Sequence, residues 1–193
     1  MIESDNWQVL DSRIKYQAHF EVVQDHLRKP TGDEMIYNYI NSKCAAAILA
    51  FTTEGKVIVT RQYRHPIRKT IYDLPAGGII SGETSEQAVR RELKEETGYR
   101  VKEISLLGSF YPSPGMHASK IDVYLANEAE PGNPNPDENE IIEIELMDWQ
   151  DVVGLVQSNQ SIDVTLAYAV MRYGMMNQSQ PNPACRGHGS AVR

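Results

Sequence analysis

The stretch that decides the fold is GGIISGETSEQAVRRELKEETGY, which occupies residues 77–99. Thr84 followed three residues later by Gln87 is a capping-box signature, so a helix should begin at this point. Gly98 is the kind of residue that ends a helix in a left-handed conformation. The spacing therefore predicts a helix over Thr84–Thr97 that is delimited at both ends.

Three glutamates share one side of this predicted helix. Glu92 and Glu96 are four residues apart, and Glu92 and Glu95 are three apart, so at about 100° per residue their carboxylates lie within one sector. Like charges at these spacings cost a helix about 0.2–0.5 kcal/mol for each pair. A solvated acidic face is one interpretation. A cation site is the other, since Mg²⁺ and Mn²⁺ prefer oxygen ligands and bridge carboxylates to phosphates.

The frame of the whole stretch favours the cation site. Its fixed positions are Gly77, Glu83, Arg91-Glu92-Leu93, Glu95-Glu96 and Gly98, separated by five, seven, one and one residues. This frame resembles the signature of the Nudix hydrolases at every fixed polar and glycine position, while Tyr99 stands where an aliphatic residue is usual. The resemblance implies an α+β fold, an α/β/α sandwich with a mixed β-sheet between helices, preceded by an N-terminal antiparallel β extension.

The resemblance also implies a site for Mg²⁺, with Mn²⁺ as an alternative and two or more ions per site. Its ligands would be Glu92, Glu95 and Glu96, aided by the backbone carbonyl of Ala76. Arg91 would orient the glutamates. Glu83, which points away from them by helical phase, is interpreted as a structural partner of Arg91, with a direct catalytic role as the alternative. Bound ions neutralise a diphosphate and lower the pKa of a water that attacks phosphorus in line.

Motifs outside the box resemble the ADP-ribose pyrophosphatase branch, whose members also cleave other nucleoside diphosphate sugars. They are Arg61-Gln62-Tyr63-Arg64-His65-Pro66, Leu74-Pro75-Ala76-Gly77 and Tyr111-Pro112-Ser113-Pro114-Gly115. The implied reaction is Mg²⁺-dependent hydrolysis of the pyrophosphate bond of ADP-ribose or a related sugar, giving a nucleoside monophosphate and a sugar phosphate. GDP-mannose or another nucleotide sugar as substrate, and a nucleotide sensor without catalysis, are the alternatives.

Candidate substrate-binding residues lie in these motifs and in the N-terminal strand. They are Arg64, Arg61, Tyr16, Pro114 and His117. A guanidinium offers a planar fork of donors that suits a phosphate, although a plain exposed side chain is the alternative for Arg64 and His117. Tyr16 could stack on a base or be buried in a core or dimer interface. Ser119 stands where the branch often has an acidic residue, a departure that concerns specificity.

The segment Glu130–Glu140 combines three prolines with several acidic residues between two predicted strands, so it is predicted to be a loop. In the branch that the chain resembles, the loop between the last strands supplies a glutamate that activates or positions water. Glu140 is the first choice for this catalytic role and Glu138 the second. Such a residue could close over the substrate and complete the site when it is bound.

Alternating or apolar runs predict the remaining elements. The predicted strands are Arg13–Leu27, Met35–Ile40, Cys44–Thr52, Lys56–Tyr63, Ile71–Leu74, Ile104–Tyr111, Ile121–Ala126 and Ile141–Met147, and two more helices are Asp148–Ser158 and Asp163–Tyr173. A turn is expected at residues 28–33, and the runs on either side of Thr53-Glu54-Gly55 should form a buried hairpin. We expect residues 1–41 to form a β extension that dimerises, 42–176 to form a Nudix domain and 177–193 to be a disordered tail. The extension resembles strands that build domain-swapped homodimers.

Composition and charge limit the classes of partner that this protein is expected to bind. A net charge of −7 over 193 residues, with no long Lys/Arg block, argues against nucleic acid. The longest apolar stretch, Cys44–Phe51, is far short of the roughly 20 residues that span a bilayer, and no membrane partner is expected. Cys44 and Cys185 form neither a disulfide framework nor a metal-ligand spacing. We therefore expect a cytoplasmic protein that acts on a small nucleoside diphosphate.

Overall fold

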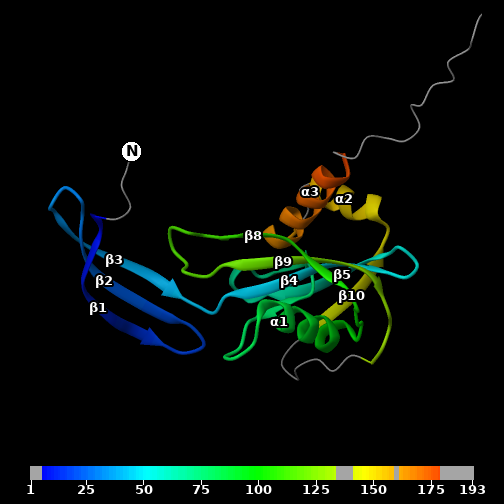
Figure 1. Ribbon diagram of the computed structural model, residues 1–193, viewed down its shortest axis with the longest axis horizontal. Coiled ribbons are helices and arrows are strands. Elements are labelled where there is room, and N and C mark those ends of the chain that lie inside the picture. Colours follow the sequence, from blue (N-terminus) through cyan, green and yellow to red (C-terminus); the bar gives the residue numbers. More distant parts are fainter. Residues whose placement is uncertain (1–5, 134–140, 159–160, 179–193) are drawn as a thin grey trace, which may run out of the picture.

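The computed structural model describes residues 6–133, 141–158 and 161–178. These residues form a three-stranded sheet, a seven-stranded sheet and three α-helices. The small sheet projects from one end of the larger body, which contains the seven-stranded sheet and the helices (Figure 1). Within these ranges, no helix is both long and apolar enough to cross a membrane.

The small sheet is antiparallel and has the strand order β1 (Gln8–Gln17), β2 (Glu21–Arg28), β3 (Glu34–Asn41). The prediction of a single strand over Arg13–Leu27 is wrong, because the chain reverses direction between β1 and β2. At the reversal the Ala18 N–H donates to the Phe20 carbonyl oxygen (2.9 Å). No glycine or proline stands in this turn, so the alternating apolar pattern runs through it without a break.

The second turn of this sheet lies where the sequence places it. The Lys29 N–H donates to the Asp33 carbonyl oxygen (2.8 Å), and Gly32 has a φ of 93°, a left-handed conformation that glycine adopts without steric cost. The strand predicted over Met35–Ile40 is confirmed as β3. Every residue of β1 is exposed, so this strand contributes nothing to a core within one chain.

The large sheet is mixed. Its strands are β4 (Ala45–Thr52), β5 (Val57–Arg64), β6 (Lys69–Asp73), β7 (Ala76–Gly78), β8 (Ile104–Phe110), β9 (Ile121–Ala129) and β10 (Ile142–Met147). The order is β10-β5-β4-β9-β8, with β6 beside β5 and β7 beside β4. Only the β4–β9 pair is parallel among the described strands. The strands predicted from apolar runs are confirmed, while the short β7 was not predicted.

The predicted hairpin of β4 and β5 forms only next to its turn. The two strands pair at Phe51 and Val57, and beyond this point β4 pairs with β7 and β9, while β5 pairs with β6 and β10. The hairpin therefore opens, which brings the start of the box, on β7, against the middle of the body.

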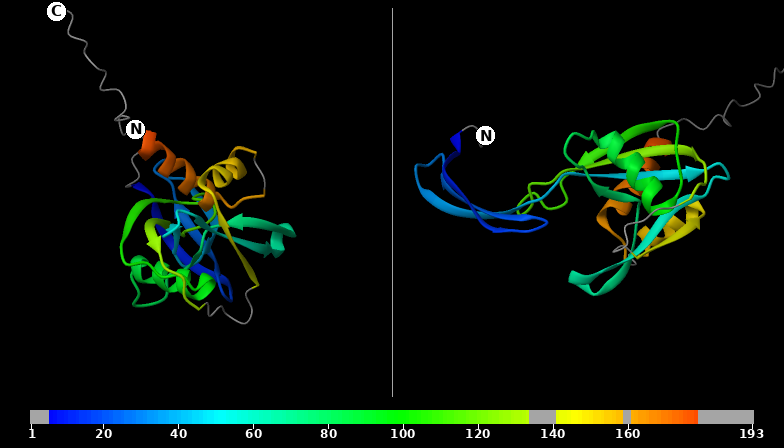
Figure 2. Two further views of the ribbon diagram at one scale, coloured as in Figure 1. Left: turned by 90° about the vertical axis from the view of Figure 1, so that its right-hand side faces the viewer. Right: turned by 90° about the horizontal axis from the view of Figure 1, so that it is seen from below.

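Helices cover both faces of this sheet: α1 (Ser85–Glu92) on one face, α2 (Trp149–Gln157) and α3 (Val164–Gln178) on the other (Figures 1 and 2). Successive residues of a strand point to opposite faces. Ile48 accordingly belongs to the core cluster that contains Val89 of α1, and Leu49 to the cluster that contains Val152 of α2 and Leu166 of α3. The α/β/α sandwich is confirmed.

Helix α3 continues beyond Tyr173, where the sequence analysis ended it. The Tyr173 ring packs on Phe51 and Trp149, with ring centroids 5.2 and 5.0 Å apart. Gly174 costs a helix about 1 kcal/mol, and this packing at the preceding residue offsets it. The helix therefore includes the first two residues of the tail predicted at 177–193. The rest of that tail, 179–193, lies outside the described residues.

Candidate active site

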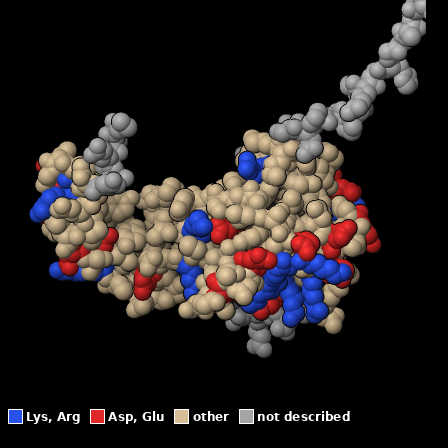
Figure 3. All heavy atoms as spheres, in the orientation of Figure 1, with Lys and Arg blue, Asp and Glu red and all other residues tan. Residues whose placement is uncertain are grey.

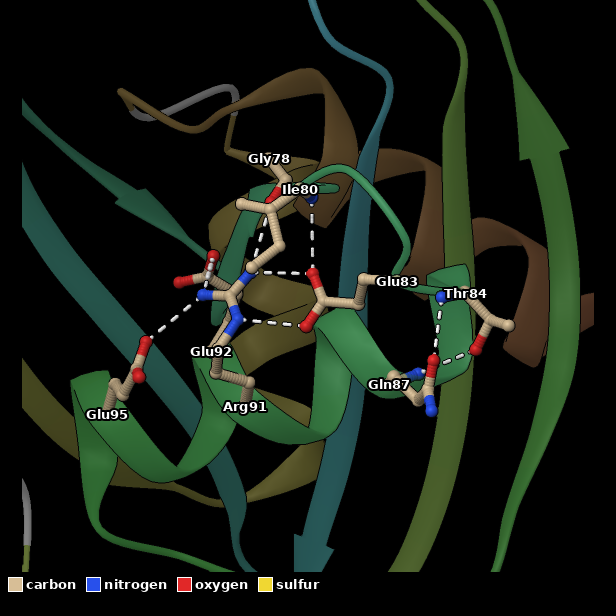
Figure 4. A network of polar contacts seen from close by, with 8 residues as sticks. All are labelled: Gly78, Ile80, Glu83, Thr84, Gln87, Arg91, Glu92 and Glu95. Atoms are coloured by element: carbon tan, nitrogen blue, oxygen red, sulfur yellow. Dashed lines mark hydrogen bonds and ion pairs between the residues drawn. The ribbon is translucent and has the colours of Figure 1, made fainter.

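The box helix begins as predicted and ends differently. Thr84 Oγ1 accepts a hydrogen bond from the Gln87 N–H (3.2 Å), and the Gln87 side chain accepts one from the Thr84 N–H (2.8 Å; Figure 4). After Glu92 the chain forms a π-helical turn over Leu93–Thr97, and Gly98 ends it with a φ of 77°. The predicted single α-helix is therefore an α-helix followed by a wider turn, a feature frequent at functional sites.

Arg91 lies at the centre of a carboxylate network (Figure 4). Its Nε and Nη2 atoms donate to the two oxygens of Glu83 (2.9 and 3.0 Å), an arrangement in which a planar fork meets both oxygens. Its Nη1 atom donates to Glu92 Oε1 (2.6 Å) and Glu95 Oε2 (3.1 Å), and Nη2 also donates to the Gly78 carbonyl (3.1 Å). The prediction that Glu83 is a structural partner of Arg91 is confirmed.

The charges of this network stabilise one another. The hydrogen bond from Arg91 lowers the pKa of Glu83, and the Ile80 N–H, which donates to Glu83 Oε2 (3.2 Å), lowers it further. The hydrogen bond to Glu83 in turn raises the pKa of Arg91, with smaller contributions from Glu92 and Glu95. Arg91 is thus a permanent cation beside the glutamates, so part of their mutual repulsion is offset within the protein.

Glu92 reaches from α1 to strand β7 at Gly77. A Cβ atom at Gly77 would overlap the carboxyl group of Glu92. The Glu92 side chain is only 13% exposed, so its carboxylate lies in a narrow space between the helix and the strand. The absence of a side chain at Gly77 is what makes this space available.

Glu96 meets the same strand one residue earlier. The Ala76 N–H donates to Glu96 Oε2 (3.2 Å), and Glu96 is buried. Glu95, in contrast, has a side chain that is 41% exposed. Two carboxylates of the box therefore lie against neighbouring residues of β7, and the third lies toward solvent.

These carboxylates fit the chemistry of Mg²⁺, although they do not form a closed cage. Across residues 6–133, 141–158 and 161–178, no three His, Cys, Asp or Glu side chains are gathered closely enough to hold an ion by themselves. Arg91 and the Ala76 N–H hold the glutamates instead. Mg²⁺ characteristically takes one or two carboxylates and completes its shell with water and substrate phosphates. The site offers such oxygens around Gly77.

Arg64 stands at the end of β5, where its Nη2 atom donates to Asp73 Oδ2 (2.8 Å). Asp73 ends β6 and is buried, whereas the Arg64 side chain is 42% exposed. Burial, together with the nearby Asp163, raises the pKa of Asp73 to about 6. Asp73 is not among the site residues predicted from the sequence. Its only signal is a charged residue within the apolar run Ile71–Leu74.

Arg61 interacts with two glutamates of strand β10. Its Nη1 atom donates to Glu143 Oε2 (3.0 Å) and Glu145 Oε1 (3.1 Å). Its guanidinium carbon lies 5.3 Å from the centroid of the Tyr72 ring, a distance typical of a cation–π contact. The two candidate arginines are therefore not brought together, and each has carboxylate partners of its own.

Pro114 and His117 lie on the loop between β8 and β9, which contacts the end of β3. The Tyr37 hydroxyl donates to the Gly115 carbonyl (2.7 Å). Ile40 exchanges backbone hydrogen bonds with the residues on either side of His117 (2.8 and 3.0 Å). The small sheet therefore holds this loop in place, a contact that the sequence analysis did not predict.

Of the remaining candidates, Tyr16 is described, and it does not lie at the box within one chain (Figure 1). Tyr16 is 52% exposed on β1, which lies well away from α1 (Figure 1). Glu138 and Glu140 lie outside the described residues. Among the described residues, the structure thus groups Arg91 and the box glutamates next to β7.

The surface around α1 carries charges of both signs (Figure 3). Arg90 pairs with Glu86 (2.9 Å), and Lys102 pairs with Glu130 (2.8 Å). Exposed pairs of this kind contribute at most about 1 kcal/mol each to stability. The basic side chains gathered here are accordingly compensated by acidic neighbours.

Comparison with known proteins gives the following relatives. Residues 42–167 match the NUDIX domain. The ADP-ribose pyrophosphatase of Bacillus subtilis (strain 168) is 36% identical over 143 residues, which cover 73% of this chain and 77% of that protein. The methanol dehydrogenase activator of Bacillus methanolicus is 29% identical over 148 residues, which cover 76% of this chain and 80% of that protein.

A solved structure shares the fold. The crystal structure of an ADP compounds hydrolase aligns with a TM-score of 0.73, covering 91% of this chain and 97% of the other at 20% sequence identity. At this level of identity the likeness concerns the fold.

Proposed function

This chain belongs to the NUDIX family and is a pyrophosphohydrolase, and from that premise we propose that its substrate is ADP-ribose or a related nucleoside diphosphate sugar. The products are a nucleoside monophosphate and a sugar phosphate. The observation that carries the proposal is the arrangement of a complete box, in which Arg91 holds Glu92 and Glu95 and the Ala76 N–H holds Glu96. The Bacillus subtilis relative, named an ADP-ribose pyrophosphatase, supports the substrate class.

In this proposal Glu92, Glu95 and Glu96 hold Mg²⁺ or Mn²⁺, two or more ions per site, with the Ala76 carbonyl as a further ligand. A bound cation neutralises the diphosphate and lowers the pKa of water near phosphorus. Arg91 orients Glu92 and Glu95 through its 2.6 and 3.1 Å hydrogen bonds, so these ligands need little reorganisation on binding.

Substrate contacts come from three places. Arg64 presents a guanidinium that is 42% exposed, and a guanidinium fork suits phosphate oxygens. Arg61 is the second basic residue of the same strand. Pro114 and His117 contact the sugar from the loop that β3 holds, and Tyr16 stacks on the base.

A glutamate before β10 positions the attacking water, with Glu140 as first choice and Glu138 as second. Both lie outside the described residues, so the support for this step is their position in the sequence. Glu140→Gln and Glu138→Gln are compared in turnover assays at saturating substrate. One of them should lose most of its activity, and full activity in both would contradict this part of the proposal.

A second copy of the chain is the partner proposed for the small sheet. The β1 side chains Val9, Leu10 and Ile14 are 62%, 38% and 55% exposed, and a second copy of the chain is the occupant proposed for these exposed apolar side chains. A homodimer with swapped N-terminal strands would cover β1 and bring Tyr16 to the partner's site. Light scattering should give twice the chain mass of 21.7 kDa, and a monomer would contradict the dimer.

A cytoplasmic location completes the proposal. It is supported by a sequence with only two cysteines, which suits a reducing compartment. Cell fractionation with an antibody against the protein tests it, since recovery outside the cytoplasmic fraction would contradict it.

The deciding experiment is a substrate screen on the purified full chain. ADP-ribose, GDP-mannose, UDP-glucose, dinucleotides and 8-oxo nucleotides are incubated with Mg²⁺ or Mn²⁺, and the products are separated by chromatography. We expect ADP-ribose to give AMP and ribose 5-phosphate at the highest rate. Faster cleavage of GDP-mannose would identify GDP-mannose as the preferred substrate. Binding of ADP-ribose without cleavage would indicate a sensor and would overturn the proposal.

A further inference from the structure

Asp73 is a buried carboxylate close to the proposed metal ligands, and the proposed reaction assigns it no role. It is 4% exposed and stands three residues before Ala76, whose N–H binds Glu96. Three residues of chain extend over at most about 10 Å. The Asp73 Cα therefore lies within that distance of the Ala76 Cα.

Both oxygens of Asp73 are engaged. Oδ1 accepts a hydrogen bond from the Leu74 N–H (2.8 Å), and Oδ2 accepts one from Arg64 Nη2 (2.8 Å). A buried carboxylate with these partners does not bind a substrate itself, so its action is on the guanidinium. Arg64 has five N–H donors and a side chain that is 42% exposed. It can therefore bind Asp73 on one side and a ligand on the other.

A contribution to the stability of the fold does not explain the ion pair between Asp73 and Arg64. Burial and the charge of Asp163 raise the pKa of Asp73, and the Leu74 N–H and Arg64 offset this only in part. Its charged form is thus disfavoured by the fold. Because a buried ion pair is often replaced by neutral residues without loss of stability, the arrangement calls for another role.

We propose that Asp73 is a positioning residue that holds the Arg64 guanidinium in place for the diphosphate of the substrate. The proposal rests on the proposed function, which assigns Arg64 to the substrate. A free arginine side chain at a strand end samples several rotamers, and binding must then select one of them. A fixed carboxylate makes that selection before the substrate arrives, which lowers the cost of binding.

Asp73→Asn tests the role directly, because asparagine keeps the size and can still accept the Leu74 N–H. At pH 7.5 we expect the KM for ADP-ribose to rise about tenfold, as loss of a charge-assisted hydrogen bond implies. The kcat should change less than about threefold, the signature of lost binding. An unchanged KM in a folded variant would overturn the proposal.

A double-mutant comparison separates action through Arg64 from a general effect on the fold. If Asp73 acts only through Arg64, the Asp73→Asn/Arg64→Gln double variant should have the KM of Arg64→Gln alone, within about twofold. Multiplied effects of the two single changes would show that Asp73 acts elsewhere and would overturn the proposal.

The pH profile gives a readout that a structural role would not move. The charged groups facing Asp73 are Arg64 from β5 and Asp163 from the segment before α3. The KM of the unaltered protein should rise as the pH falls from 7 to 5 and Asp73 gains a proton, and Asp73→Asn should lack this rise.

Asp163→Asn is the second variant, and it leaves the ion pair intact. Asp163 Oδ1 accepts from the Thr165 N–H (2.7 Å), and asparagine serves this capping role as well as aspartate. Removal of the like charge should move the rise in KM to lower pH. An unmoved rise would overturn the proposal, and this variant decides the question if Asp73→Asn does not fold.

Calorimetric titration with ADP-ribose in EDTA separates failure of this proposal from failure of the proposed function. If the protein binds ADP-ribose without cleaving it, a roughly tenfold weaker Kd in Asp73→Asn still supports positioning. An equal Kd in the two proteins overturns positioning while the hydrolase assignment stands on the substrate screen. Absence of any binding by the unaltered protein, together with no cleavage in the substrate screen, overturns both.

Discussion

Replacement of Gly77 by alanine tests how closely the box helix is fitted to β7. The new Cβ would overlap the carboxyl group of Glu92, which must move by clearly more than about 1 Å to reach van der Waals contact. The cost to the fold is small, because the overlapping atoms end a flexible side chain. Gly77 also has no positive φ, and alanine at such a position gains about 0.4–1 kcal/mol by restricting the unfolded chain.

We expect kcat to fall about 100-fold, since a displacement of about 1 Å in an active site has an effect of that size. The midpoint of thermal unfolding should change by less than about 4 °C, which corresponds to roughly 1 kcal/mol for a chain of this length. Gly78→Ala is the matched control, because its Cβ would meet only Lys43 side-chain atoms, the nearest at 3.7 Å. That variant should keep kcat within about twofold, as an ordinary contact implies.

The assay measures initial rates of ADP-ribose hydrolysis at saturating Mg²⁺, with a phosphatase that releases phosphate from the products. Thermal unfolding of the three proteins is recorded in the same buffer. A folded Gly77→Ala variant with the original kcat would refute the reasoning, because the position of the Glu92 carboxylate would then be immaterial. Equal losses in Gly77→Ala and Gly78→Ala would also refute it, since the overlap with Glu92 would not be their cause.

Three further predictions concern single carboxylates. Glu96→Gln should lower turnover at saturating Mg²⁺ at least about 100-fold and abolish the rise in unfolding temperature on adding Mg²⁺; near-normal turnover would exclude a role as metal ligand. Because Arg91 lowers the pKa of Glu83 from its usual 4.5, the unaltered protein should lose stability as pH falls through that lowered value, whereas Glu83→Gln should not; equal unfolding temperatures from pH 7 to 3 would contradict this. The pKa of Asp73 is raised from 3.8 to about 6, so the unaltered protein loses stability as the pH rises through 6. Asp73→Asn should therefore be about 3 kcal/mol more stable than the unaltered protein at pH 8 and equally stable near pH 3. Urea denaturation that shows Asp73→Asn to be less stable at pH 8 would contradict this.

Local patterns were enough to predict the two ends of the box helix and the strands of the large sheet other than β7. The capping pair Thr84 and Gln87 and the terminal Gly98 lie within a few residues of the bonds they make. The ion pair of Glu83 with Arg91 could also be predicted from helical phase, because Glu83 lies just before α1 and Arg91 lies within it. The same local reasoning failed at Ala18–Phe20, where the turn contains neither glycine nor proline.

The tertiary structure decided how the box glutamates and the arginines are held. Helical phase places Glu92 and Glu96 on one side of a helix, but only the packing of α1 on β7 brings them to Gly77 and Ala76. The π-helical turn that carries Glu96 has no sequence signal of its own.

Contacts between distant segments could not be predicted from the sequence. Asp73 meets Arg64 because β5 and β6 form a hairpin, and Tyr37 meets Gly115 across 78 residues because the small sheet contacts the loop after β8. Strand and helix patterns repeat every 2 and about 3.6 residues and can be recognised along the chain. The sequence by itself thus determined most of the secondary structure and the choice of the metal-binding carboxylates proposed here. The partners of Arg64 and of the loop depend on which elements become neighbours in space, and only the folded chain decides that.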